Sequence, residues 1–399
     1  MKRIEQLAAK YADQVIAYRR HMHMYPEVSL EEKETAAFIA AKLRDMGLEP
    51  QENIGGYGVV AVIEGGKGPG RCIGLRADFD ALPIQEETGL PYASKNPGVM
   101  HACGHVMNAA MLLGVAHVLL EMKNEFAGSV KLIFQPAEEW VLCGGAIDMI
   151  RDGVMENPHV DAMLAQHIEP TEELGKALLL CSGPAVTSTD RLFLTVKGQS
   201  CHGSRPHLGI DGVVIAAQIV NAIQTIVARS VPPVETVVVS FGCIEGGERY
   251  DILAKEVKLQ GTMRTLSPEW REKTPQLIER IANGVCEALG GSCEFSVGKG
   301  YPPTILDEEM HALAEETAEK LLGRDRLILC REPNMGGEDF SFFAQAAPSM
   351  TWCLGARPAH VSVEEARPLH NNGFNPDEGS MEIGVKLMTA CALEFLAKE

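Results

Sequence analysis

Side chains that commonly bind metal ions are concentrated in residues 100–114, which read MHACGHVMNAAMLLG. His101, Cys103 and His105 place two imidazoles and one thiol within five residues, and the apolar run that follows predicts a buried helix. Ligands on a turn that is backed by a helix are a common way to build a rigid metal site. Taken alone, Cys103 and His105 leave two interpretations open: a metal site, or one of eleven scattered cysteines beside a histidine that caps a helix.

Two adjacent carboxylates, Glu138 and Glu139, follow the apolar segment 129–134. Because neighbouring side chains diverge, one of them can bind a metal ion while the other holds the attacking water. The alternative is a solvated acidic turn. The buried segment before the pair and Trp140 after it favour a functional site.

Five further side chains of the right chemistry are more ambiguous. His167 ends the short apolar segment AMLAQH and His370 lies in the loop RPLHNNGF, so each is either a metal ligand or a structural histidine. Asp78 and Asp80 lie where a strand is expected to end, and they either organise the site or cap the next turn. The role of His202, in SCHGSRPH, depends on the fold.

Alternating strand and helix patterns in the first 185 residues predict an α/β domain whose strand ends carry these side chains. One helix is expected to open at Ser29, because Ser-Leu-Glu-Glu resembles a capping box, and to close at Gly47. The other expected helices are 2–24, 109–122 and 146–152, and the expected strands are 57–64, 72–77, 129–134 and 162–166.

The pattern changes near residue 185 to β-α-β-β-α-β, the split ferredoxin-like unit. Its second helix is expected to begin at Pro268 with Ser267 as the N-cap. The sequence therefore predicts an insertion, 186–302, inside a discontinuous first domain, 1–185 and 303–399. The expected elements of the insertion are strands 191–196, 236–244, 256–264 and 292–297 and helices 210–228 and 268–289; helices 308–322 and 380–398 follow it.

Composition excludes several classes of protein. The 399 residues carry a formal net charge of −18 and no basic stripe, so nucleic-acid or anionic-membrane binding is not expected. The N-terminus lacks the apolar core of a signal peptide, and no apolar run approaches the length of a membrane span. No two of the eleven cysteines are spaced as CxxC, which excludes a zinc ribbon, and their odd number favours a reducing cytoplasm.

Eight motifs in order resemble one family: HMYPEVSLEE, LRADFDALPIQEETGLPYAS, MHACGH, FQPAEE, the His-x-x-x-Pro-His of the insertion, GTMRT, MGGEDFSFF and PLHNN. The resemblance is to the dimetal peptidase superfamily of aminoacylases and carboxypeptidase G, in the branch of hippurate hydrolase and the indole-acetyl-amino-acid hydrolases. It implies a zinc-peptidase-like α/β catalytic domain with a mixed central sheet, interrupted by a ferredoxin-like α+β domain that mediates dimerisation. It also implies a homodimer.

The resemblance further implies two divalent metal ions and a role for particular residues. Glu138 would be the general base, and Asp80 would support the metal shell. His202 would reach across the dimer to the substrate and stabilise the oxyanion, and Arg264 would bind the substrate. His23 and His101 would be structural. The implied metal ligands are Cys103, which would bridge the two ions, and His105, Glu139, His167 and His370. This mixed sulfur, nitrogen and oxygen set suits Mn or Zn, with Co or Ni also compatible.

The implied activity is hydrolysis of an N-acyl amino acid or a related small amide. One departure from the family pattern leaves alternatives open: Asp-x-His after CGH is replaced by Val106-Met107-Asn108. These positions are expected to lie behind the ligands, where lost partners commonly cost ~10–100-fold in metal affinity or activity. Asp251 to Ala254 and Asn371-Asn372 also depart from the pattern. The alternatives are a dipeptidase or other C–N hydrolase, and a binding or regulatory homologue with impaired catalysis.

Overall fold

The computed structural model describes residues 1–140 and 144–398. The chain divides into two compact units. The first unit comprises Met1–Gly183, Ile305–Pro333 and Asp339–Glu399, and the second comprises Pro184–Thr304 and Asn334–Glu338. The second unit holds the whole of the insertion that the sequence places at 186–302.

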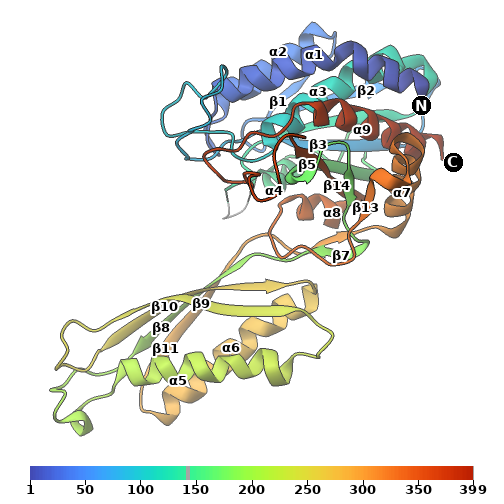
Figure 1. Cartoon of the computed structure of the whole chain (residues 1–399). Coiled ribbons are helices and arrows are strands. Elements are labelled where there is room, and N and C mark those ends of the chain that lie inside the picture. Colours follow the sequence, from blue (N-terminus) through green and yellow to red (C-terminus); the bar gives the residue numbers. More distant parts are fainter. Residues whose placement is uncertain (141–143, 399) are drawn as a thin grey trace. The chain divides into compact units, whose positions relative to one another are not determined.

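The first unit is built on a mixed sheet of eight strands with helices on both of its faces (Figure 1). The strands in sheet order are β1 (Gln51–Ile54), β2 (Gly58–Glu64), β4 (Ser129–Gln135), β3 (Cys72–Asp78), β5 (Ala162–Glu173), β14 (Ser349–Arg357), β6 (Ala177–Leu179) and β13 (Leu327–Leu329). The helices are α1 (Lys2–Met24), α2 (Lys33–Asp45), α3 (His105–Glu121), α4 (Gly144–Arg151), α7 (Glu308–Leu322), α8 (Phe340–Ala346) and α9 (Gly379–Ala397), with short 3-10 helices at Lys123–Glu125 and Arg324–Arg326. The expected α/β class with a mixed central sheet is confirmed.

Four neighbouring strands at the centre, β4, β3, β5 and β14, run parallel to one another. Every residue of β3 and β4 is buried, and the two strands end at the paired residues Asp78 and Gln135. The carboxyl ends of parallel strands meet at one edge of a sheet, which is where α/β proteins bind their ligands. The chain segments that follow β3 and β4 therefore leave the sheet at a common edge.

Helix α3 is apolar on all sides because protein surrounds it. It contacts β3 and β5 on one side and is covered by α1 and α9 on the other, while α4 and α8 lie on the opposite face of the sheet (Figure 1). The helices approach closely at Gly114, where an added Cβ atom would lie 2.7 Å from the side chains of both Val15 and Val385. This packing holds the first turn of α3, and His105 within it, against the sheet.

Two expectations about the first unit were wrong in detail, and one central strand was missed. Helix α2 begins at Lys33, not at Ser29, because the Ser29 hydroxyl donates to Asp80 across 2.7 Å and does not cap the helix. Helix α3 begins at His105, four residues before the expected start, so the histidine lies on the helix and not on the preceding turn. The central strand β14 was not predicted at all.

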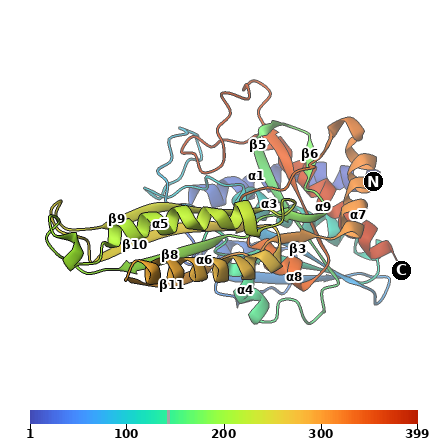
Figure 2. The ribbon, with the colours of Figure 1, turned by 90° about the horizontal axis from the view of Figure 1, so that it is seen from below.

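The second unit has the order β8 (Asp190–Lys197), α5 (Gly212–Thr225), β9 (Val237–Gly246), β10 (Glu256–Thr265), α6 (Pro268–Ala288) and β11 (Ser292–Lys299). This confirms the expected β-α-β-β-α-β pattern. Its antiparallel sheet has the order β11-β8-β10-β9, and α5 and α6 lie side by side on one face of it (Figure 2). The Ser267 side chain accepts the Trp270 N–H, as expected for the N-cap of α6. The short elements of the second unit are a 3-10 helix at Pro206–Leu208 and a π-helical turn at Ile226–Ser230. A separate pair of strands, β7 (Gly183–Val186) and β12 (Thr304–Leu306), lies at the sequence boundaries between the two units.

One helical segment in the described residues, Gly212–Ser230, is long and apolar enough to cross a membrane by length and composition. It comprises α5 and the π-helical turn that follows. One face of α5 is buried in the core of the second unit. Its side chains Ile215, Ile219 and Ile223 pack there against the strands of the sheet. Core helices of globular proteins pass the same length and composition test, and 33% of the most apolar window of this segment is buried.

Candidate metal centre

Cys103 lies at the centre of two groups of ligand-type side chains in the first unit. In each group the ligand atoms all lie within 4.8 Å of one another. The first group is Cys103, His105 and His167; the second is Cys103, Glu139 and His370. The structure thus brings together all five side chains that the resemblance implies as ligands, and it places the thiol in both groups. A shared thiol is the arrangement that a thiolate bridging two metal ions requires.

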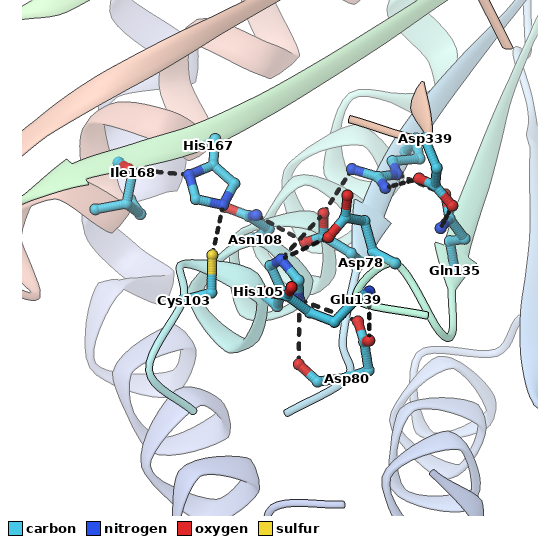
Figure 3. Close-up of polar contacts among 12 residues, drawn as sticks. Asp78, Asp80, Cys103, His105, Asn108, Gln135, Glu139, His167, Ile168 and Asp339 are labelled. Carbon is cyan, nitrogen blue, oxygen red and sulfur yellow. Dashed lines mark hydrogen bonds and ion pairs between the residues drawn. The ribbon is translucent and has the colours of Figure 1, made fainter. Parts of the chain in front are cut away.

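Each histidine of the first group is oriented by a hydrogen bond at Nδ1 (Figure 3). His105 Nδ1 lies 3.0 Å from Asp80 Oδ1 and 3.1 Å from the Asp80 carbonyl oxygen. His167 Nδ1 lies 2.9 Å from the carbonyl oxygen of Ile168. The Nε2 atoms are left facing the centre: that of His167 lies 3.4 Å from Cys103 Sγ. Metal-binding histidines are held in this way, because the Nδ1 partner fixes the tautomer and the orientation of the ring.

The two carboxylates after β4 face the centre from its other side. Glu138 Oε2 lies 3.6 Å from His105 Nε2, and Glu139 Oε1 lies 3.0 Å from His370 Nε2. Glu138 and Glu139 also form a third close group with His105. The side chain of His370 is 51% exposed, whereas Cys103 is 7% exposed, so the centre is closed on the side of α3 and open on the side of His370.

Two strained backbone positions flank the centre. Ala137, directly before Glu138, has φ 55°, and His370 has φ 62°. The left-handed region is uncommon for residues other than glycine, and such strain persists where the surrounding structure holds it. The His370 N–H donates to the Ala102 carbonyl across 2.7 Å, which ties the histidine loop to the turn that carries Cys103.

Charges at the centre are arranged for a cation. Burial alone would raise the pKa of the Cys103 thiol, but His105 and His167 outweigh it and lower the pKa to about 5. Burial would lower the pKa of His167, yet Cys103 raises it to about 9. Hydrogen bonds to Cys103 and Glu139 raise the pKa of His370 to about 10. The thiolate and the carboxylate thus attract positive charge. In this structure that charge is carried by protons on the imidazoles, and a divalent metal ion can replace these protons. The set of donor atoms therefore fits a divalent metal ion.

Behind the ligand-type side chains lies a buried network, of which sequence reasoning had named only Asp78. Arg76 donates to Asp78 across 2.5 Å, to Gln135 across 2.7 Å and to Asp339 across 2.6 Å (Figure 3). Gln135 in turn donates to Asp339 across 2.7 Å. Arg76 lowers the pKa of Asp78 although burial acts the other way. The available signal was that these residues fall inside the motifs LRADFDALP, FQPAEE and MGGEDFSFF.

Two of the expected site residues, His202 and Arg264, belong to the second unit. His202 is exposed, and its Nδ1 lies 2.9 Å from the Ser204 hydroxyl. Arg264 is half-buried at the end of β10 and donates to the Thr262 hydroxyl across 2.6 Å. Their roles in substrate binding stay predictions, as do the roles of the five ligand-type residues.

Comparison with known proteins identifies the family of this chain. The model of peptidase family M20/M25/M40 matches residues 74–394. The chain is 41% identical over 306 residues to an N-acyl-L-amino acid amidohydrolase of Geobacillus stearothermophilus, covering 77% of this chain and 81% of the relative. It is 37% identical over 388 residues to thermostable carboxypeptidase 1 of Saccharolobus solfataricus, covering 97% and 96%.

Among solved structures, the YxeP protein of Bacillus subtilis, described as a dinuclear metal-binding peptidase of the M20 family, matches with a TM-score of 0.83 and 30% identity over 97% of this chain and 99% of the other. Fold and site therefore define a metal-dependent hydrolase. The chain belongs to peptidase family M20/M25/M40.

Proposed function

We propose that this protein hydrolyses the amide bond of an N-acyl amino acid or a related small amide. The observation that carries the proposal is the position of Glu138, whose carboxylate lies 3.6 Å from His105 Nε2 at the edge of two ligand groups that share Cys103. Amide hydrolysis needs an activated water, a base and positive charge for the developing oxyanion. A dimetal centre with an adjacent carboxylate supplies all three.

The two ions would be held by Cys103 with His105 and His167, and by Cys103 with Glu139 and His370. When bound, they would lower the pKa of water from ~15.7 towards ~7 and polarise the amide carbonyl. Thiolate and imidazole ligands favour Zn or Mn over Mg or Ca, with Co and Ni also compatible. Asp80 would keep His105 in the tautomer that presents Nε2 to the ion.

Glu138 would act as the general base. Its carboxylate takes the proton of the attacking water and returns it to the leaving amine as the C–N bond breaks. His202 would donate to the oxyanion, and Arg264 would pair with the carboxylate of the substrate. The names of the two relatives support this bond class, since an N-acyl-amino-acid amidohydrolase and a carboxypeptidase both cleave an amide next to a carboxylate. The carboxypeptidase name favours a dipeptidase as the second candidate.

We further propose that the protein is a homodimer formed through the second unit. Strand β9 lies at the edge of its sheet and exposes the apolar side chains of Val238 and Ile244. Exposed apolar edge strands readily pair with another strand. Light scattering should give twice the mass of the chain, and Val238→Lys with Ile244→Lys should give a monomer. A wild-type monomer at micromolar concentration would contradict this. A cytoplasmic location stays a prediction.

The experiment that tests the function uses the purified protein loaded in turn with Mn, Zn, Co and Ni. Release of free amine is measured for a panel of N-acyl amino acids and dipeptides, for the wild type and for Glu138→Ala. We expect two ions per chain in both proteins and turnover in the wild type alone. Turnover that survives Glu138→Ala rules out the proposed base. A wild type that takes up no metal would favour the binding or regulatory alternative.

A further inference from the structure

Glu32 is a buried carboxyl group that the reaction described above does not use. Its exposed fraction is 0%, and it lies directly before α2. Its Oε1 accepts the backbone N–H of Ala137 across 2.8 Å, although the two residues are 105 positions apart. Its Oε2 is buried and has no hydrogen-bond partner within residues 1–140 and 144–398. Burial raises the pKa of Glu32 to about 7. Burying a carboxyl group is costly, so the contact with Ala137 calls for an explanation.

Ala137 is the corner of the turn that carries Glu138 and Glu139. Its φ of 55° costs an L-residue ~1–2 kcal/mol, and it is 1% exposed. Its carbonyl accepts the N–H of Gly145 across 3.0 Å. The Ala137 N–H is therefore held by Glu32, while its carbonyl is held by the first turn of α4. Relaxation of Ala137 to negative φ would redirect the two glutamates that follow it.

The far end of the same turn is held by a second carboxylate. The Glu139 N–H donates to Asp80 Oδ2 across 2.9 Å, and the Ser29 hydroxyl donates to the same oxygen across 2.7 Å. Residues 29–32 thus reach both ends of the turn: Glu32 directly and Ser29 through Asp80. This segment precedes the residues 74–394 that the family model matches.

We propose that Glu32 is a positioning residue that keeps Ala137 in the left-handed conformation and thereby aims Glu138 and Glu139 into the metal centre. The roles of the two glutamates rest on the proposed function. The contribution of Glu32 is the acceptor oxygen at the Ala137 N–H. Glutamine retains such an oxygen, whereas leucine has a similar size and lacks it.

The test compares Glu32→Leu and Glu32→Gln with the control Glu31→Leu, which changes the exposed neighbour. We expect Glu32→Leu to lower kcat ~10–100-fold with KM within about threefold, and to weaken binding of one metal ion by a similar factor in chelator competition. Glu32→Gln and the control should stay within about threefold of the wild type in both measurements. A loss in Glu32→Gln equal to that in Glu32→Leu would overturn the proposal, because it would make the charge the important property.

A double-mutant cycle with Ala137→Gly separates positioning from packing. Glycine adopts positive φ without the steric penalty of a Cβ atom, so the loss caused by Glu32→Leu should be several-fold smaller in the glycine background. An equal loss in both backgrounds would overturn the proposal. The metal-binding measurement needs no substrate. A wild type that binds two ions but hydrolyses no amide would contradict the proposed function. In that case chelator competition on the Glu32 variants would still decide whether Glu32 positions the turn.

Discussion

The Asn108 side-chain amide donates to Asp78 Oδ1 across 2.8 Å, in a region closed to solvent. This contact bears on the departure of Val106 and Asn108 from the family pattern. Asn108 still offers an N–H donor at the position where the pattern has a histidine, and Val106 is buried in the packing of α3. Asp78 keeps its partners Arg76 and Asn108, and it lies 3.8 Å from His105. Position 108 therefore still carries an N–H donor for the buried carboxylate of Asp78.

Asn108→Leu should destabilise the protein and weaken metal binding. Leucine removes the donor and leaves a buried oxygen of Asp78 with one partner fewer, which typically costs ~1–3 kcal/mol. Urea unfolding of the metal-free protein measures the change in stability, and chelator competition measures the change in affinity. Asn108→His keeps an N–H donor and is the matched control, with a smaller loss in both measurements. A leucine variant as stable as the wild type would show that the contact carries no net energy.

Cys103→Ala should lose more metal than His370→Ala, because Cys103 belongs to both ligand groups and His370 to one. We expect the alanine at 103 to prevent stable binding of both ions and the alanine at 370 to leave one ion bound per chain. Elemental analysis after gel filtration gives the counts. Cys72→Ala, which removes another buried thiol at the start of β3, should retain both ions. One ion lost from each of the two site variants would contradict a shared thiolate.

Metal binding at pH 7 should release about three protons per chain. The pKa of His167 is raised to about 9 and that of His370 to about 10, and the pKa of His105 is also raised, so all three imidazoles hold a proton that a metal ion must displace. The thiol of Cys103, with a pKa of about 5, is already ionised. Calorimetry in buffers of different ionisation enthalpy measures the number released. The apparent affinity should therefore rise with pH, and an affinity independent of pH between 6 and 8 would refute this picture.

The metal-free protein should lose stability between pH 5 and pH 8 through Glu32. Its pKa is about 7 in the folded protein, against an ordinary value of 4.5. In this range the folded state binds the proton more tightly than the unfolded state, so the stabilisation is complete below pH 4.5 and is lost as the pH rises through 7. The full difference corresponds to ~3 kcal/mol. Urea midpoints at several pH values measure it, and Glu32→Gln, which cannot ionise, should show a decline smaller by about this amount.

Local sequence patterns were sufficient to predict an element where its structure depends only on neighbouring residues. Ser267 and Pro268 mark the start of α6, because N-cap chemistry involves only neighbouring residues. Ser29 failed for the opposite reason: its hydroxyl bonds to Asp80, a partner 51 residues away, and α2 begins later. Strand β14 is buried on both faces and was not predicted, although its first four residues, Ser-Met-Thr-Trp, alternate polar and apolar side chains.

The residues of the candidate site also include some that the sequence could predict and some that it could not. Cys103, Glu138 and Glu139 could be proposed from residue type and spacing, whereas His370 was ambiguous from the residues alone and only the resemblance implied that it is a ligand. Glu32 could not be found from the sequence, because nothing local distinguishes it from the exposed Glu31 beside it. Only the fold brings its carboxyl to Ala137. Residues that hold a turn by a single long-range hydrogen bond leave no periodic or spacing signal.

The position of β14 also bears on synthesis of the chain. This strand lies between β5 and β6 in the sheet, yet it is made more than 160 residues after them, once the whole of β8 to β11 has been made. Until residue 357 leaves the ribosome, β5 and β6 lack the strand that joins them, whereas the four-stranded sheet of the second unit already has all its strands. We therefore expect the inserted unit to fold first on the ribosome, and the metal centre, which needs His370, to form last.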